Sequence, residues 1–442
     1  MFFRYISHSV VPTTTLHLCR AVRVGRTSRC AEQTELRENE FKIWRPPTPT
    51  TTTEPERRTS MEKVEEDFSK LRVAQRSAHT PEDLTYLLDI DCLRPWPEQT
   101  SPLLAASCSD RCVRVYDRQT LTLLRLFKGH SAPVSRVRFG RGRGQLFSAS
   151  CDGTVRCWDA RSQSPDAART YRGFPGNAFL GFDISCGGTV LCAGTEQVDE
   201  DAFLVFWDAR ADAQEPLGVY SESHSDDITQ VRFHPSDPDR MASGSTDGLV
   251  NVFDLGRDTE ADALLATCNS DSSVSFVGWS GEEGAQVFCT THDEGFSLWD
   301  LTHLETEEPL ALVRMNDARE TTEIDGSALD YLIGGFYHHR TRRLLVLGGT
   351  HLGKLHFLSC EAGADGLTHL YSPRDAHSAT VRAFYWDSED ESVVTAGEDA
   401  QLLLWKPGAV ETSGKKKEAT KERSSLQKKM RIHGGAAYKS KK

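Results

Sequence analysis

The chain has 442 residues, 12 of them cysteines, and a formal net charge of −12 at neutral pH. This length suffices for one large β domain or for two domains of ordinary size. No apolar run approaches the roughly 20 residues that span a bilayer, no two cysteines form a CxxC pair, and no secretory signal precedes them. These features exclude a membrane-spanning protein and predict reduced thiols in the cytosol or nucleus, without a zinc site.

The charge is distributed unevenly along the chain. Residues 1–60 carry 10 Lys and Arg against 6 Asp and Glu, and residues 414–442 carry 11 against 2. The 353 residues between them carry 31 against 56, a net charge of −25. We expect this acidic body to repel nucleic acid phosphates and to favour basic protein partners.

The chain begins with a basic, Pro/Thr-rich extension at residues 1–60, which we expect to be disordered. Its first 30 residues hold five arginines and no Asp or Glu, a composition typical of a mitochondrial transit peptide. Pro12 and the Thr run after it disfavour the amphipathic helix of such a peptide. The alternative is an upstream extension that precedes a natural start at Met61.

Strand-like runs then recur, each ending in an aromatic residue followed by a polar one. The residues between turn and aromatic alternate, as in DGTVRCW, which predicts a tight turn and a half-buried strand. Two more strand patterns precede each turn, so the unit is strand, loop, strand, tight turn, strand and a longer link. An aspartate stands six residues before each aromatic, in the pairs Asp110 and Tyr116, Asp152 and Trp158, Asp201 and Trp207, Asp247 and Phe253, Asp293 and Trp299, and Asp399 and Trp405.

The spacing of these units predicts how many there are. The polar residues of successive dipeptides are 42, 49, 46 and 46 residues apart from Asp117 to Asp300. The next gap, of 106 residues to Lys406, has room for two units. Its hidden member is 331–359, which keeps the strand pattern without the Asp or the Trp. We therefore expect seven units over residues 82–406.

This repeat resembles that of the WD-repeat family, whose units are four-stranded blades of a β-propeller. The resemblance covers nearly all of the chain after Met61 and implies an all-β, seven-bladed propeller at residues 61–410 between disordered extensions. Residues 61–81 are the expected closing segment. Within it we expect 64–77 to supply the outer strand of the seventh blade, because an open blade edge is a liability.

Two repeats carry the family's full network of internal polar side chains. By resemblance, the indole N–H donates to a hydroxyl, the hydroxyl to the imidazole, and the other ring nitrogen to a carboxylate. Each such group costs about 1–3 kcal/mol if it is buried without a partner, so we expect the network to hold the loops between blades onto the strands. The members are His130, Ser148, Asp152 and Trp158 in the second repeat, His377, Thr395, Asp399 and Trp405 in the seventh, and the partial set His224, Ser243 and Asp247 in the fourth, where Phe253 replaces the indole.

The stretch THDEGFSLWD at 291–300 places His292, Asp293 and Glu294 side by side, as a metal site or a proton-transfer site could. The repeat instead assigns Asp293 to a turn and Trp299 to a strand, with His292 and Glu294 flanking the turn on the rim. Adjacent residues in a tight turn diverge, whereas metal ligands converge, and the chain has no P-loop or GxGxxG motif. The sequence therefore predicts no catalytic residues, no cofactor and no metal.

The tetrapeptide WDAR occurs in two consecutive repeats, at 158–161 and 207–210. It resembles the motif by which WD-repeat substrate receptors dock on the adaptor of cullin–RING ubiquitin ligases. The resemblance implies that Arg161 and Arg210 contact that adaptor. The alternative is that each is a turn residue that pairs locally with an acid.

The chain ends in a Lys/Arg-rich segment, residues 411–442, which we expect to be disordered. It is either a solvated tail or a nuclear or nucleolar address with weak RNA contact. Two functions follow for the whole chain. One is a non-catalytic scaffold for proteins or peptides, in the nucleus, nucleolus and cytoplasm; the other is a ubiquitin-ligase substrate receptor. A mitochondrial location applies if residues 1–30 act as a transit peptide.

Overall fold

The computed structural model describes residues 66–409 with short gaps. The gaps are residue 67 and 78–84, 94–101, 143, 174–176, 212–214, 305–308, 325, 361–365 and 375. The predicted extensions 1–60 and 411–442, with the transit peptide and the basic tail, therefore lie outside the described residues.

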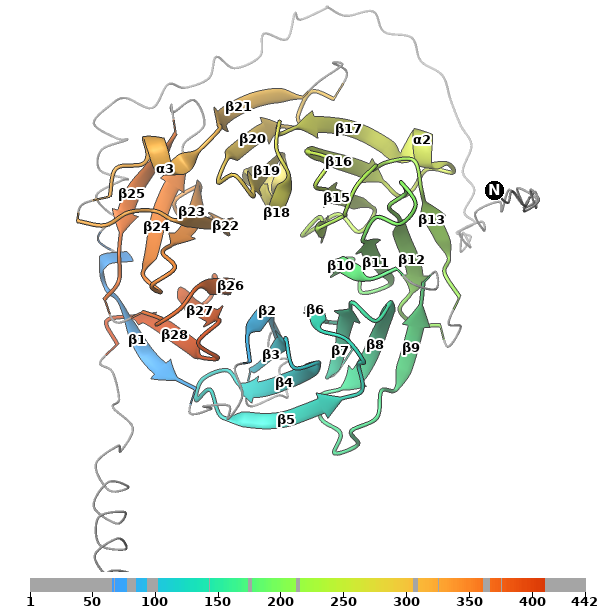
Figure 1. Cartoon of the computed structure of the whole chain (residues 1–442), viewed down its shortest axis with the longest axis horizontal. Coiled ribbons are helices and arrows are strands. Elements are labelled where there is room, and N and C mark those ends of the chain that lie inside the picture. Colours follow the sequence, from blue (N-terminus) through green and yellow to red (C-terminus); the bar gives the residue numbers. More distant parts are fainter. Residues whose placement is uncertain are drawn as a thin grey trace, which may run out of the picture.

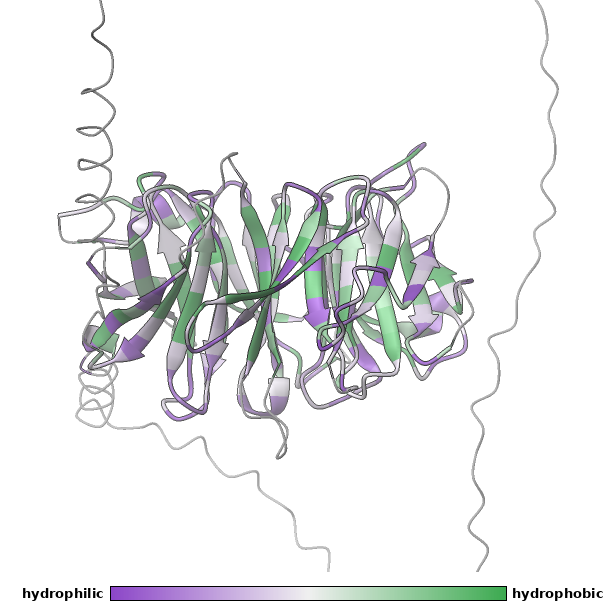
Figure 2. Cartoon of the chain, turned by 90° about the horizontal axis from the view of Figure 1, so that it is seen from below, coloured by the Kyte–Doolittle hydropathy of each residue, from purple (hydrophilic) through white to green (hydrophobic). Residues whose placement is uncertain are grey.

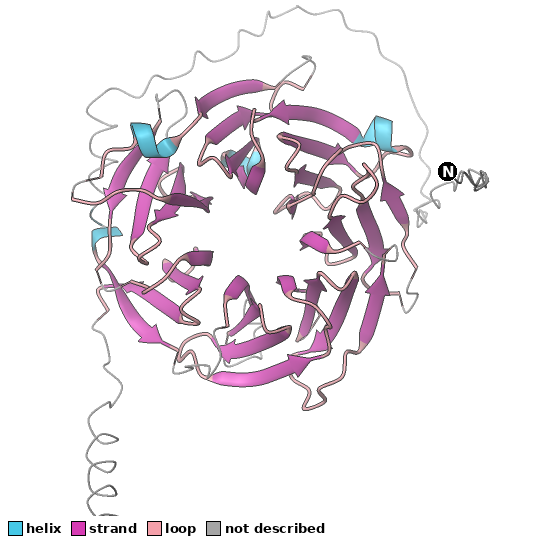
Figure 3. Ribbon diagram, viewed as in Figure 1, coloured by secondary structure: helices cyan, strands magenta, loops and turns pink. Residues whose placement is uncertain are grey.

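Seven four-stranded antiparallel sheets surround a central axis (Figure 1). We call them blades 1 to 7, in the order of their innermost strands along the chain. Strands dominate the described residues, and the few helices are short and lie outside the sheets (Figure 3). The structure thus confirms the seven-bladed β-propeller.

The strands of each blade run consecutively from the axis outward, except in blade 7. Blade 1 holds β2 (Leu87–Leu93), β3 (Leu103–Cys108), β4 (Cys112–Asp117) and β5 (Leu123–Lys128). Blade 2 holds β6 (Val134–Phe139), β7 (Gln145–Ser150), β8 (Thr154–Asp159) and β9 (Arg169–Arg172). Blade 3 holds β10 (Phe179–Ile184), β11 (Val190–Thr195), β12 (Leu204–Asp208) and β13 (Gly218–Tyr220). Blade 4 holds β14 (Gln230–Phe233), β15 (Arg240–Gly244), β16 (Leu249–Asp254) and β17 (Leu264–Asn269).

The remaining blades follow the same order. Blade 5 holds β18 (Val274–Ser280), β19 (Gln286–Thr291), β20 (Phe296–Asp300) and β21 (Leu310–Met315). Blade 6 holds β22 (Tyr331–His338), β23 (Arg343–Gly349), β24 (Leu355–Cys360) and β25 (Leu367–Tyr371). Blade 7 holds β26 (Val381–Asp387), β27 (Ser392–Gly397), β28 (Leu402–Pro407) and β1 (Leu71–Arg76). Short helices lie in the connections: α2 (Glu260–Ala263) between β16 and β17, η1 (Glu282–Gly284) between β18 and β19, and α3 (Ala318–Thr321) between β21 and β22.

The ring closes through β1, which comes from the start of the described chain and pairs antiparallel with β28, near its end. Val73 lies opposite Trp405, and Gly408 N donates to Lys70 O at 2.8 Å. Phe68, just before β1, is buried against the rings of Phe357 and Trp386. The segment 64–77 thus contributes the outer strand of the seventh blade.

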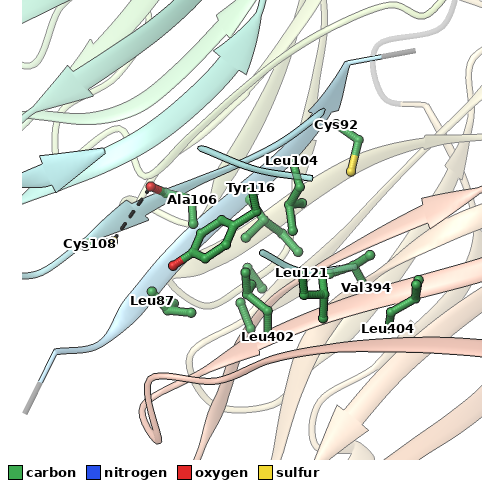
Figure 4. Packing of buried hydrophobic residues seen from close by; sticks show 13 residues of the cluster. Leu87, Cys92, Leu104, Ala106, Cys108, Tyr116, Leu121, Val394, Leu402 and Leu404 are labelled. Atoms are coloured by element: carbon green, nitrogen blue, oxygen red, sulfur yellow. Dashed lines mark hydrogen bonds between the residues drawn. The ribbon is translucent and has the colours of Figure 1, made fainter. Parts of the chain in front are cut away.

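The core lies between neighbouring blades, because each sheet is apolar on both faces. Seen from the side, apolar residues extend along strands across the whole width of the ring, with polar residues among them (Figure 2). Figure 4 shows the cluster between blades 1 and 7, where Leu104 and Tyr116 meet Val394 and Leu404. The repeated aromatics fill these layers and are at most 2% exposed: Tyr116, Trp158, Trp207, Phe253, Trp299 and Trp405. Burial of such side chains is worth about 1.5–3 kcal/mol each.

We call the face that carries the turns before the third strands the turn face. In blades 1, 2, 4, 5 and 7 the residue after the turn Asp has a positive φ, for example 71° at Gly153 and 86° at Gly248. Blade 3 differs, since its positive φ values are at Asp199 and Glu200, before Asp201. In blade 6 Leu352 stands in the place of the Asp, and Gly353 keeps the same conformation with φ 85°. A Cβ on Gly353 would lie 2.3 Å from His377 O, so this turn requires glycine.

Candidate functional site

Blade 2 brings together the four residues that the sequence pattern groups. His130 Nδ1 lies 2.9 Å from Asp152 Oδ2, and its Nε2 lies 2.8 Å from Ser148 Oγ. The indole Nε1 of Trp158 donates to the same hydroxyl at 2.8 Å. Ser131 N also donates to Asp152 at 2.9 Å, so the network fastens the link after blade 1 to the turn of blade 2.

Blade 7 repeats this arrangement. His377 Nδ1 lies 2.9 Å from Asp399 Oδ1, and its Nε2 lies 2.8 Å from Thr395 Oγ1. Trp405 Nε1 donates to that hydroxyl at 2.9 Å. The two complete networks therefore lie in the blades on either side of blade 1.

Blade 4 keeps the same geometry without an indole. His224 lies 2.9 Å from Asp247 Oδ2 and 2.7 Å from Ser243 Oγ. Asn251, two residues before Phe253, places its Nδ2 3.4 Å from His224 Nε2 and donates to Ser223 O at 2.6 Å. The sequence pattern did not identify Asn251, because the repeat places no polar partner at that position.

The carboxylates of these networks are held ionised. Burial opposes ionisation of Asp152, but hydrogen bonds from His130 and Thr154 outweigh it and lower the pKa of Asp152 below its usual value. Burial likewise opposes ionisation of Asp247 and Asp399, and hydrogen bonds from their histidines lower both pKa values. Carboxylates committed in this way are not poised to exchange protons with a substrate.

Blades 3 and 6 use other contacts. Trp207 donates its indole N–H to Arg172 O at 3.3 Å, and Asp201 forms an isolated β-bridge with Val198. In blade 6, Asp330 accepts a bond from His351 N at 2.9 Å. The blade 6 bond thus joins the turn to the segment before β22, whereas in blade 3 the indole joins β12 to β9 of blade 2.

The trio in THDEGFSLWD does not converge. Asp293 accepts a bond from Ser272 Oγ at 2.6 Å, and Glu294 accepts one from Leu332 N of blade 6 at 2.5 Å. His292 and Glu294 lie on either side of Asp293 in the turn between β19 and β20. His292 is exposed, whereas Glu294 is half-buried and contacts the backbone of the next blade.

The described residues offer no sign of a metal or redox centre. No three His, Cys, Asp or Glu side chains among them are grouped so as to hold a metal ion. No disulfide joins the cysteines in that part of the chain. No helix there has the length and apolar character needed to cross a membrane.

The two WDAR arginines are exposed, and each pairs with the Asp of its own repeat. Arg161 donates from Nε and Nη2 to the two oxygens of Asp159, at 3.0 and 2.9 Å. Arg210 does the same with Asp208, at 2.9 and 2.8 Å. Their side chains are 56% and 70% exposed. Because the third strand carries the chain away from its turn, both arginines lie on the face opposite the turn face.

Neighbouring outer strands fix the two WDAR loops. Arg169 of β9 donates to Ala209 O at 2.6 Å, and Arg125 of β5 donates to Ser162 O at 3.2 Å. Blade 4 adds a third exposed arginine, Arg257, which donates to Asp254 at 3.1 Å. Arg257 escaped the sequence analysis because it stands one position later than in the WDAR repeats. The face thus presents three arginines on consecutive blades.

The comparisons with known proteins agree with this architecture. Residues 121–159 and 214–254 match the model of the family described as "WD domain, G-beta repeat". The chain is 26% identical over 326 residues to "WD repeat-containing protein 89 homolog" of Dictyostelium discoideum, covering 73% of this chain and 83% of that protein. It is 30% identical over 328 residues to "WD repeat-containing protein GTS1" of Arabidopsis thaliana, covering 69% and 78%. It is 21% identical over 356 residues to "DDB1- and CUL4-associated factor 13" of Xenopus laevis, covering 80% and 70%.

Proposed function

Because the chain belongs to the WD-repeat family, we propose that it is a non-catalytic scaffold that binds proteins or peptides within a nuclear or nucleolar assembly. The observation that supports this proposal is that polar side chains on the turn face bond to one another within the protein. His130, Asp152 and their counterparts are committed to hydrogen bonds that brace the blades. The loops are therefore held in fixed positions, as a binding platform requires.

Charge indicates the kind of partner and the place. The acidic body favours basic proteins. Asp199, Glu200 and Asp201 at the turn of blade 3 and Glu222 before blade 4 are exposed. Gln197 N donates to Asp227 at 2.7 Å and so joins the two loops. The Lys/Arg-rich tail, 414–442, supports a nuclear or nucleolar address with weak RNA contact.

Proximity labelling in cells tests this function. We expect the full chain to label nuclear or nucleolar proteins, and a chain that lacks residues 414–442 to lose most of that set. A set made up of cytosolic proteins, unchanged by the truncation, would contradict the nuclear assembly. Imaging of the full chain and of a chain that starts at Met61 tests the mitochondrial alternative. That alternative requires that the full chain enters mitochondria and that the shorter chain does not.

A second function, a substrate receptor of a cullin–RING ubiquitin ligase, is favoured by Arg161 and Arg210. Their guanidiniums are exposed on one face, and each is aligned by its own Asp. An arginine held in this way loses little entropy on binding and can anchor an interface. A relative named "DDB1- and CUL4-associated factor 13" adds support.

Pull-down with the ligase adaptor tests this second function. We expect the Arg161→Ala, Arg210→Ala double variant to lose the adaptor, since truncation of an anchoring arginine costs at least about 2 kcal/mol. Arg257→Ala is the matched control, because Arg257 also pairs with the Asp of its repeat on the next blade. Equal recovery of the adaptor by all variants would count against a receptor.

A further inference from the structure

Two arginines on the innermost strands have no carboxylate partner. Arg136 of β6 donates from Nη2 to Thr229 O at 3.2 Å, and Arg232 of β14 donates from Nε to Val277 O at 3.3 Å. Among the described residues, neither forms an ion pair. None of their other nitrogens is a buried donor without a partner. Both residues are half-buried, and both belong to the first strand of their sheet, at the inner edge of the ring (Figure 1).

The nearby carboxylates are already engaged. Asp89 accepts bonds from Arg138 Nη1 at 2.6 Å and from Val137 N at 3.1 Å. Asp183 accepts from Arg138 Nε at 3.2 Å and from Phe233 N at 2.8 Å. The third, Asp91, accepts from Phe139 N at 2.7 Å. Arg138 thus forms ion pairs with two of the carboxylates, and Arg136 and Arg232 form none with them.

The surroundings disfavour the charge of both arginines. Burial, together with the nearby charge of Arg138, lowers the pKa of Arg232 to about 10. Burial also lowers the pKa of Arg136, against the attraction of Asp89. An anion placed between the two guanidiniums would relieve this repulsion and accept their free N–H groups.

The opposite side of the axis is aromatic. Phe384 of β26 lies 6.3 Å from Phe276 of β18 and 6.0 Å from Phe336 of β22, between ring centroids. All three rings are half-buried, although inner strands pack on both sides of them. Phe276 can lie close to blade 6 because Gly334 has no side chain. A Cβ at that position would lie 2.7 Å from the Phe276 ring. The Arg232 guanidinium lies 5.1 Å from the Phe276 centroid, so the cationic and aromatic halves meet there.

We propose that the axis of the propeller binds a short peptide that carries Asp or Glu next to an aromatic or aliphatic residue. The carboxylate binds between Arg136 and Arg232, and the apolar side chain packs on Phe276 and Phe384. The net charge of −25 on the body repels such a peptide elsewhere on the surface, so charge directs it to the axis. This inference rests on the scaffold function and specifies the chemistry of one partner.

Selection from a random heptapeptide library displayed on its messenger RNA tests the site with the purified full chain. We expect the bound peptides to be enriched in an acidic residue beside an apolar one. The best peptide, labelled with fluorescein, should bind the Arg136→Gln, Arg232→Gln variant at least about tenfold more weakly. It should bind more weakly as salt increases. Enrichment without acidic residues, or no enrichment at all, would overturn the proposal.

Two variants separate binding from folding. Arg136→Lys, Arg232→Lys keeps both charges and should keep most of the affinity, whereas Arg257→Gln removes an exposed arginine far from the inner strands and should leave the affinity unchanged. Thermal unfolding of each variant identifies any loss that comes from a disturbed fold. Equal binding by the glutamine and lysine variants would place the peptide elsewhere. The selection uses purified protein only, so its failure would contradict the peptide site and leave the nuclear function untouched. A negative result of the proximity labelling would contradict the nuclear function and leave the peptide site untouched.

Discussion

Arg118 of blade 1 and Asp387 of blade 7 form a buried ion pair between the first and the last blade. Arg118 also donates to Ser392 Oγ at 2.7 Å and to Asp390 Oδ1 at 3.0 Å. The ring itself is closed inside blade 7, where β1 and β28 are held together by their pairing. The polar network of Arg118 and the core between blades 1 and 7 join the closed blade to its neighbour.

Arg118→Ala is expected to lower the free energy of unfolding by about 3–5 kcal/mol, because it leaves the buried Asp387 carboxylate without its cationic partner and with only the Glu389 N–H as donor. Urea unfolding followed by circular dichroism measures the loss. The double variant Arg118→Met, Asp387→Leu should recover most of the stability, since it removes both buried charges. A loss in the double variant as large as in the single one would contradict this explanation.

Ser148→Ala is expected to cost more stability than Ser243→Ala. In blade 2 the change leaves both Trp158 Nε1 and His130 Nε2 without their partner, whereas in blade 4 only His224 Nε2 is affected. Each orphaned group costs about 1–3 kcal/mol, so the two variants should differ by roughly that amount. Chemical unfolding of both proteins under the same conditions gives the difference, and equal costs would show that the indole adds nothing.

Asp152→Asn is expected to make stability less dependent on acid. The folded-state pKa of Asp152 lies below its usual value, so its contribution is complete above the unfolded pKa of about 4. That contribution is lost as the pH falls from about 5 towards the folded pKa. Between pH 5 and pH 3 the wild type should therefore lose about 1 kcal/mol more than the variant. Asp166→Asn, at an exposed aspartate, is the control and should follow the wild type.

Glu294→Ala is expected to destabilise the protein by about 1–3 kcal/mol, because Leu332 N loses its acceptor at the boundary of blades 5 and 6. His292→Ala, at the exposed neighbour, should change stability by less than about 0.5 kcal/mol. Differential scanning calorimetry of the two variants makes the comparison. A larger effect of His292 would indicate a role for the trio that the hydrogen bonds do not explain.

A chain that starts at Met61 is expected to unfold at the same temperature as the full chain, because β1 and Phe68 are retained. A chain that starts at Ser77 lacks both and leaves the edge of β28 and the rings of Phe357 and Trp386 uncovered. It should aggregate or unfold at least about 10 °C lower. Thermal unfolding of the three proteins tests the proposed domain boundary, and an unchanged midpoint for the shortest chain would contradict it.

The local periodicity of the sequence was enough to predict much of the fold. The spacing from Asp152 to Trp158 predicts a turn and a strand whatever surrounds them, because alternation along a strand and a turn aspartate are properties of neighbouring residues. Seven such units imply a ring, and the structure has that ring. The outer strands were less evident: β13 has only three residues and β9 four, and edge strands that bury one face carry a weak pattern.

The sequence by itself determined the repeat, the number of units and the residues that brace them, since each of these depends on short-range spacing. Only the tertiary structure decided the contacts between blades. Glu294 meets Leu332, Arg118 meets Asp387, and Arg136 and Arg232 are left without carboxylates at the axis. Residues up to 269 positions apart meet in these contacts, and which of two neighbouring acids an arginine reaches depends on packing that no local pattern encodes.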